Sequence, residues 1–200
     1  MSIGRGLRRR QKNRWVRKMK IIQSLLAEIE RQKNILDRLK VFHSRMNNDI
    51  IGATEVRPGG YYRSRGLDVI LKFNRPLTRD DIDRNNEISR WLNESFIIRL
   101  YALLDSHKIF SPRIDDALDG NQELDILRRL RRILAHSLGK YHPDVPYQMK
   151  LVNRLISHFG IQIVDPKEFP LDIDKVIDPL IKGCKKYVKG KFAKKGSETE

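Results

Sequence analysis

The segment from residue 124 to residue 137 combines arginines and a histidine in a pattern suited to chemistry on a charged substrate. On a helical wheel at about 100° per residue, apolar side chains of this segment and of the residue that follows it share one face: Ile126, Leu127, Leu130, Ile133, Leu134 and Leu138. On the other face, Arg128, Arg132 and His136 follow one another at four-residue steps. Arg129 joins them, because it lies seven residues before the histidine. The segment therefore predicts a helix with a buried face and a basic stripe.

Arg131 has a different position, at the edge of the apolar face. Guanidinium groups bind phosphate through two donors and imidazoles exchange protons near neutral pH, so Arg131 and His136 suit phosphate chemistry. A guanidinium at this edge is expected to be buried beside a partner or directed into a cleft. From periodicity alone, the alternative is a solvated basic stripe with a helix-terminal histidine that the helix dipole favours.

The run Arg131-Arg132-Ile133-Leu134-Ala135-His136 resembles the R-x4-6-H motif of the HEPN (higher eukaryotes and prokaryotes nucleotide-binding) superfamily. In that superfamily the motif lies near the end of a helix that packs against a preceding long helix, and segment 91–104 is similar to that helix. The resemblance covers about residues 79 to 190. Arg129 also satisfies the spacing, so the register stays open, and Arg132 stands where the family usually has Asn, Asp or His.

The resemblance implies an all-α, HEPN-like helical bundle and a metal-independent endoribonuclease. In such enzymes the 2′-hydroxyl of RNA is the nucleophile, and the products carry 2′,3′-cyclic phosphate and 5′-hydroxyl ends. His136 would be the general acid or base, and Arg131 would bind the phosphate and stabilise its developing charge. We expect no cofactor and no metal, because the sequence has no carboxylate cluster, Cys/His set or Gly-rich phosphate loop.

Other residues are assigned around this pair. The substrate-binding candidates are Arg128, Arg129, Arg132 and Lys140, and the supporting candidates on the preceding helix are Asn93 and Glu94. RNA is the expected partner. A role as a toxin or defence effector would add an antitoxin protein.

The spacing of Arg131 and His136 favours a homodimer. Five residues place the two side chains about 140° apart around an ideal helix, too wide for easy convergence on one phosphate. Two motif helices meeting across a two-fold axis, the arrangement known for HEPN ribonucleases, would let each helix contribute an Arg and a His to a shared cleft. Two alternatives stay open: a non-catalytic HEPN-like module that binds RNA or a partner, and a basic protein that packages nucleic acid.

The chain has 200 residues, of which 40% are hydrophobic and 33% charged, and this fits one globular domain. No apolar run approaches the roughly 18 residues that a membrane-spanning helix needs. The basic N-terminus lacks the cleavage site of a secretory signal, so a cytoplasmic protein is expected. The single cysteine, Cys184, excludes an intramolecular disulfide and a multi-thiolate metal site.

The net charge of +16 is concentrated at the two ends. Residues 1–20 hold nine Lys or Arg and no acid, residues 182–195 hold seven lysines and no acid, and the body between them is nearly neutral. Two cationic arms raise the affinity for a polyanion through counterion release without reading sequence. The alternative is a pair of solvated ends that keep the protein soluble.

Periodicity predicts helices over 7–46, 79–106, 122–138, 145–159 and 171–187, with Thr78 as an N-cap and a small β-hairpin near 55–75. Apolar residues at three- and four-residue steps mark the core side of the first helix: Ile22, Leu25, Ile29, Leu36, Leu39 and Met46. Trp91 is expected in the core. We expect a basic arm over 1–20 that continues into a long helix, one domain over 21–190 and a disordered tail over 191–200.

Overall fold

The computed structural model describes residues 3–137, 140–162 and 168–197, and the side chains of 16–136, 140–162 and 168–194. Its main helices are α1 (Ile3–Phe42), α3 (Arg79–Ser106), α4 (Asn121–Ser137), α5 (Pro146–Phe159) and α6 (Asp178–Ser197). One π-helical turn, η2 (Ile173–Ile177), leads directly into α6. The prediction of an all-α fold is confirmed.

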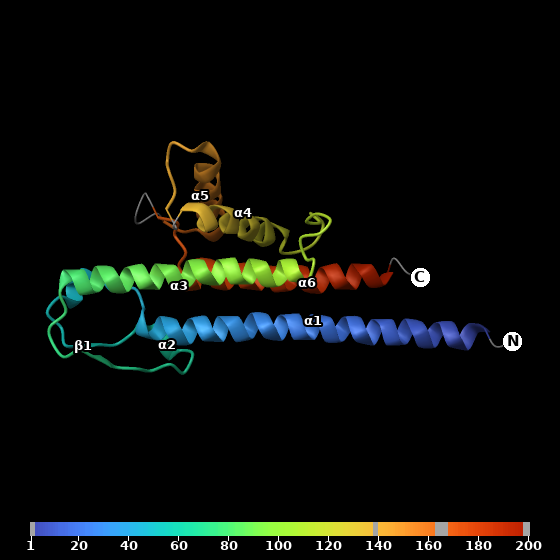
Figure 1. Cartoon of the computed structure of the whole chain (residues 1–200), viewed down its shortest axis with the longest axis horizontal. Coiled ribbons are helices and arrows are strands. Elements are labelled where there is room, and N and C mark those ends of the chain that lie inside the picture. Colours follow the sequence, from blue (N-terminus) through green and yellow to red (C-terminus); the bar gives the residue numbers. More distant parts are fainter. Residues whose placement is uncertain (1–2, 138–139, 163–167, 198–200) are drawn as a thin grey trace.

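The long helices form a layered bundle. α1 runs antiparallel to both α3 and α6, and α4 with α5 covers the other side of the α3/α6 pair (Figure 1). The described ends of α1 and α6 lie at the same end of the molecule (Figure 1). The two basic stretches of the sequence are therefore carried on neighbouring helices.

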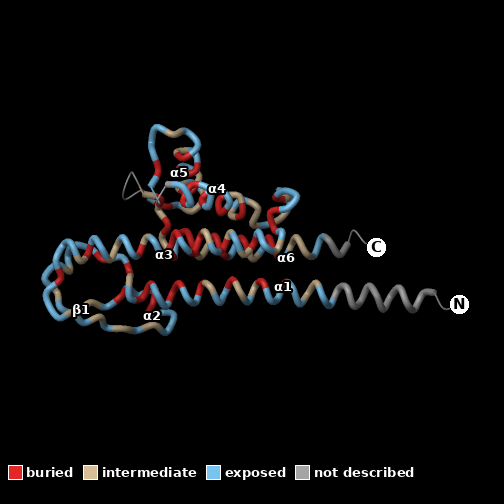
Figure 2. The backbone as a smooth tube through the Cα atoms, viewed as in Figure 1, coloured by how far each residue is buried: buried red, intermediate tan, exposed pale blue. Residues whose placement is uncertain are grey.

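Buried residues line the faces that these helices turn toward one another (Figure 2). On α1, Leu25, Ile29 and Leu36 are buried as predicted. Leu39 is 45% exposed and Trp91 of α3 is 58% exposed, so their assignment to the core was wrong. Both lie on sides of their helices that no other described element covers.

The start of α3 follows from its sequence. The Thr78 side chain accepts a hydrogen bond from the Asp81 backbone N–H, and the Asp81 carboxylate accepts one from the Thr78 backbone N–H. This capping box satisfies two amide donors that a helix start leaves unpaired. Arg75 adds two hydrogen bonds to the same carboxylate, at 2.7 and 2.8 Å. The predicted N-cap is confirmed.

The insertion between α1 and α3 contains the predicted hairpin in a reduced form. β1 (Glu55–Val56) pairs antiparallel with β2 (Leu71–Lys72), and Glu55 lies opposite Lys72. A 3-10 turn, η1 (Asn48–Ile50), precedes the hairpin, and the short helix α2 (Gly60–Arg63) lies between its strands. The two-residue strands bring the segment back to the start of α3.

The C-terminal part of the chain differs from the predicted tail. α6 continues to Ser197, so the expected disorder from residue 191 was wrong over 191–197. Phe192 packs against the core, and the Lys191 ammonium donates to the backbone carbonyls of Lys108 and Ser111 at 3.1 and 2.7 Å. These contacts offset the polar composition that predicted disorder.

A close approach joins α4 to α6. Gly120 precedes α4 with φ 86°, and a Cβ there would collide with the carbonyl oxygen of Gly183 on α6. A Cβ at Gly183 would in turn collide with the Glu123 side chain. Glycine is therefore required on both sides, and this contact fixes where α4 starts.

Candidate functional site

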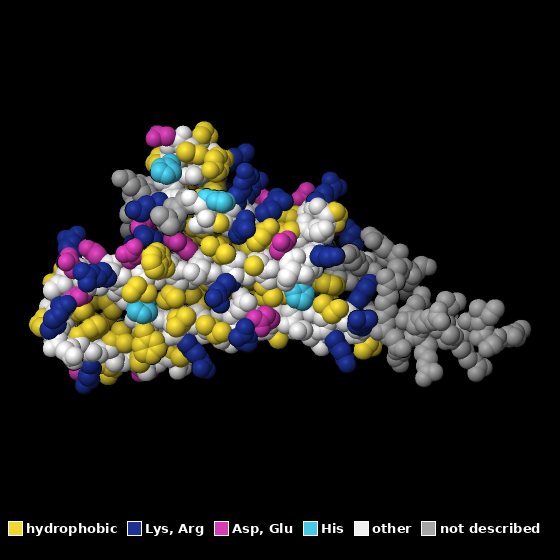
Figure 3. All heavy atoms as spheres, in the orientation of Figure 1, with side chains coloured by type: hydrophobic (Ala, Val, Ile, Leu, Met, Phe, Trp, Pro, Cys, Tyr) yellow, Lys and Arg dark blue, Asp and Glu magenta, His cyan; other side chains and the backbone are white. Residues whose placement is uncertain are grey.

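Helix α4 presents its two faces as the sequence predicts. Leu127 and Leu130 are fully buried and Leu134 is 5% exposed, whereas Arg128 is exposed. The helix packs on α6, α3 and α5. Lys and Arg side chains gather around this upper part of the molecule in Figure 3.

Asp125 organises the first half of the basic stripe. Its carboxylate accepts hydrogen bonds from Arg128 at 2.6 Å, from Arg129 at 2.8 Å and from Arg154 of α5 at 2.5 Å. Burial alone would raise the pKa of Asp125, but the hydrogen bonds from Arg129, Arg128 and Arg154 outweigh it and hold that pKa below its usual range. Arg128 and Arg129 are thus engaged by a carboxylate of their own helix.

Arg131 lies on the other edge of α4. Its guanidinium carbon is 5.3 Å from the centre of the Tyr101 ring of α3, a cation–π geometry. Tyr101 itself stacks on Phe110, with 4.5 Å between ring centres. The side chain of Arg131 is exposed, so the expected burial beside a partner was wrong: an aromatic ring covers part of it and the rest faces solvent.

His136 lies in the last turn of α4, as predicted, and is exposed. It forms no hydrogen bond or ion pair with another residue that the structure describes. Because the helix is regular, His136 and Arg131 point to different sides, about 140° apart. Within one chain the structure does not bring them together.

Arg132 and Lys140 differ in their surroundings. Arg132 is exposed on the outer face of α4. Lys140 follows the helix, forms an isolated antiparallel bridge with Glu168 and borders a cavity of about 700 Å³. The Glu168 carboxylate also pairs with the Arg90 guanidinium of α3. The described contacts of Lys140 therefore connect it to Glu168 and not to the stripe on α4.

Asn93 and Glu94 were predicted to support the motif, but their described contacts lie elsewhere. The Asn93 side-chain amide donates to the Leu171 carbonyl at 2.8 Å, and Glu94 forms an ion pair with Arg90 at 3.5 Å. Burial raises the pKa of Glu94, and the charge of Arg90 partly opposes that shift. Neither side chain has a described contact with Arg131 or His136, so their supporting role stays a prediction.

Two polar contacts between distant segments, one from Arg90 and one from Lys40, were missed by the sequence reasoning. Arg90 joins Glu94 to Glu168, and an i, i+4 spacing on α3 could have indicated the first half of that link. The buried Lys40 ammonium of α1 donates to the Ser89 carbonyl at 3.0 Å and to its hydroxyl. No sequence signal indicates this second pair, because 49 residues separate its members.

The described residues contain no group of three or more His, Cys, Asp or Glu side chains that could hold a metal ion. Among the described helices, none has both the length and the apolar composition needed to cross a membrane.

Comparison with known proteins finds no matching family model, no matching curated protein and no matching solved structure. The candidate site is thus defined by its own geometry: Arg131 on Tyr101, and His136 at the end of the same helix.

Proposed function

We propose that this protein is a HEPN-type, metal-independent endoribonuclease in which Arg131 and His136 are the catalytic residues. The observation that carries the proposal is the division of the arginines on α4. Asp125 engages Arg128 and Arg129, whereas Arg131 is exposed, lies over the Tyr101 ring and forms no hydrogen bond or ion pair with another described residue. This favours Arg131 over Arg129 as the phosphate-binding arginine.

The reaction uses a group that RNA itself supplies. The 2′-hydroxyl oxygen attacks the adjacent phosphorus, its proton passes to a neutral imidazole, and the P–O5′ bond breaks. The 5′ oxygen takes a proton from a protonated imidazole, so the products end in a 2′,3′-cyclic phosphate and a 5′-hydroxyl. Arg131 donates to the phosphoryl oxygens and stabilises the charge that develops there.

A second copy of the chain would complete the site, because one helix holds Arg131 and His136 on different sides. Exposed apolar side chains nearer the start of α3 support pairing of two copies. Trp91 is 58% and Ile88 is 39% exposed, and large exposed apolar side chains are typical of interfaces. Two copies of His136 would then supply the base and the acid.

The test is incubation of purified protein with end-labelled RNA in EDTA, followed by analysis of the product ends. Cyclic phosphate and 5′-hydroxyl ends are expected. Ends of the opposite type, or cleavage that depends on added divalent cation, would contradict the proposal.

A non-catalytic HEPN-like module that binds RNA or a partner protein is the second candidate. The separation of Arg131 from His136 within one chain favours it, as does Arg132 at the position after the motif arginine. Specific RNA binding without any cleavage, by a protein shown to be dimeric, is the result that distinguishes it.

A further inference from the structure

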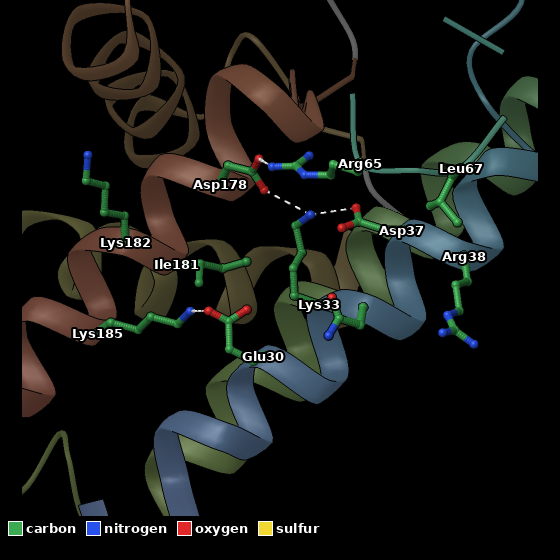
Figure 4. A pocket seen from close by; sticks show the side chains of 11 residues that line it. Glu30, Lys33, Asp37, Arg38, Arg65, Leu67, Asp178, Ile181, Lys182 and Lys185 are labelled. Carbon is green, nitrogen blue, oxygen red and sulfur yellow. Dashed lines mark hydrogen bonds and ion pairs between the residues drawn. The ribbon is translucent and has the colours of Figure 1, made fainter. Parts of the chain in front are cut away.

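A hollow of about 660 Å³ lies between α1 and α6, on the far side of the bundle from α4 (Figures 1 and 4). Its charged lining consists of Lys33, Arg38, Arg65, Lys182 and Lys185 with Glu30, Asp37 and Asp178. Five cations against three carboxylates leave a positive surplus. This hollow is separate from the Arg131 site.

The floor of the hollow is a fixed network of opposite charges. The buried Lys33 ammonium donates to Asp37 at 2.5 Å and to the Tyr61 hydroxyl at 2.9 Å, and lies 3.0 Å from Asp178. Arg65 donates to Asp178 at 2.6 Å and covers the Tyr61 ring at 4.0 Å. Two cations and two carboxylates balance here, so the floor holds the helices together and leaves the surplus to the rim.

The rim carries the cations that have no described partner. Lys185 forms an ion pair with Glu30, the third carboxylate of the lining. Arg38 and Lys182 are exposed and form no hydrogen bond or ion pair with another described residue. In Figure 4 they lie on opposite sides of the hollow, Arg38 on α1 and Lys182 on α6, and both side chains point outward from the Lys33 network.

The positive surface continues along α6. Lys182, Lys186 and Lys189 are exposed and follow at four- and three-residue steps, so they form a ridge about 10 Å long on one face. Burial, and then the charge of Lys189, lowers the pKa of Lys185. The ridge leads toward the end of the molecule where α1 also carries its basic stretch (Figure 1).

We propose that this groove binds the backbone of single-stranded RNA. A row of exposed cations above a neutral floor fits a ligand with one charge per repeating unit. An acidic peptide fits less well. Buried apolar anchors supply most of the affinity in typical peptide complexes, and the lining offers only Leu67 and Ile181.

The proposal goes beyond cleavage and is tested by binding alone. The probe is a fluorescein-labelled 2′-O-methyl oligouridylate of about 12 nucleotides, which lacks the nucleophile and stays intact. Anisotropy between about 50 and 300 mM salt gives the affinity and its salt slope. The variant Arg38→Gln/Lys182→Gln removes both unpaired rim cations. The control Arg84→Gln/Lys150→Gln makes the same charge change at exposed positions of α3 and α5.

The rim variant is expected to lower the salt slope by about 1.4, or about 0.7 for each lost phosphate contact, and to weaken binding roughly tenfold near 0.1 M salt. The control is expected to leave the slope unchanged. Equal effects of the two variants, or none from the rim variant, would overturn the proposal. So would equal competition by poly-glutamate of the same length, or equal binding of an RNA duplex. If the wild-type protein bound this probe but did not cleave unmodified RNA, the result would count against the ribonuclease proposal alone.

Discussion

The arginines of α4 and the lysines of α6 are both basic runs in the sequence. In each run, the structure gives some of the cations a partner within the protein and leaves others exposed. On α4, Asp125 engages Arg128 and Arg129, whereas Arg131 lies on an aromatic ring and Arg132 faces solvent. A carboxylate inside the run therefore decides which arginines stay available to a ligand.

On α6 the division runs along the helix. Lys191 binds backbone carbonyls after α3 and Lys194 pairs with Asp115, so these two lysines hold the fold together. Lys182 and Lys189 are exposed without a described partner. The comparison shows that net charge overstates the number of ligand-binding cations, and that fixed and available cations alternate within a few residues.

The largest expected effect is on cleavage. His136→Ala and Arg131→Ala should each reduce it by at least about 100-fold, because each removes either the proton-transfer group or the charge that stabilises the phosphoryl oxygens. Single-turnover cleavage of labelled RNA measures the effect. Circular dichroism and sedimentation should show an unchanged fold and oligomeric state.

Arg129→Ala is the matched control, since Arg129 satisfies the same motif spacing but is bound to Asp125. It should keep most of the activity. An inactive Arg129→Ala together with an active Arg131→Ala would mean that Arg129, and not Arg131, is the arginine of the motif. Wild-type cleavage by all three variants would overturn the assignment of Arg131 and His136 as catalytic residues.

Lys40 should make stability depend on pH. Burial lowers the pKa of Lys40 to about 8 from an ordinary value near 10.5; the charge of Asp172 partly opposes this shift, and the charge of Arg45 adds to it. The folded state thus disfavours the charged amine, and the stability due to this group is present above pH 10.5 and is lost as pH falls through about 8. Between pH 7 and pH 9.5 this group should raise the free energy of unfolding by about 2 kcal/mol.

The measurement is urea unfolding at both pH values for the wild type and for Lys40→Met. Deprotonation of Cys184 and of tyrosines in the unfolded state acts in both proteins, so the difference between them isolates Lys40. The wild type should gain more stability, or lose less, than Lys40→Met as pH rises. Parallel curves would show that the amine is solvated in the folded protein.

Asp125→Asn should convert fixed arginines into available ones. The substitution weakens three charge-assisted hydrogen bonds at a carboxylate that is 15% exposed, and should cost about 1–2 kcal/mol of stability. Arg128 and Arg129 would then be free to contact phosphate, so the salt slope for RNA should become steeper by up to about 1.4. Unfolding and anisotropy measure the two effects. Unchanged values of both would mean that the cluster has no energetic role.

The fold was largely predictable from sequence where one helix face is covered. The stripe Leu127, Leu130 and Leu134 is buried because α4 has one apolar face and packs with it. The prediction that Leu39 lies in the core was wrong because α1 carries two apolar stripes. Ile35, Leu39 and Phe42 form the second one at four- and three-residue steps, and all three are exposed. Periodicity tells which residues share a face, and tertiary packing decides which face is covered.

The candidate site was predictable to the same degree. The position of Arg131 at the edge of the apolar face and of His136 in the last turn follows from helix geometry alone. The ion pairs of Asp125 with Arg128 and Arg129 have the three- and four-residue spacing of helix ion pairs and could have been predicted from the sequence. The contacts of Arg131 with Tyr101, and of Asn93 with Leu171, join segments far apart in the chain and have no local signal.

The smallest expected effect separates the two kinds of lysine on α6. Lys191→Met should cost about 1 kcal/mol of unfolding free energy, because it leaves backbone carbonyls of Lys108 and Ser111 without their donor, and should change RNA affinity little. Lys189→Met should leave stability unchanged and lower the salt slope for RNA by about 0.7. Thermal unfolding and anisotropy on the same two proteins provide the comparison. If both variants changed both quantities alike, the lysines of α6 would act as one diffuse charge, and the division between fixed and available cations would not hold on this helix.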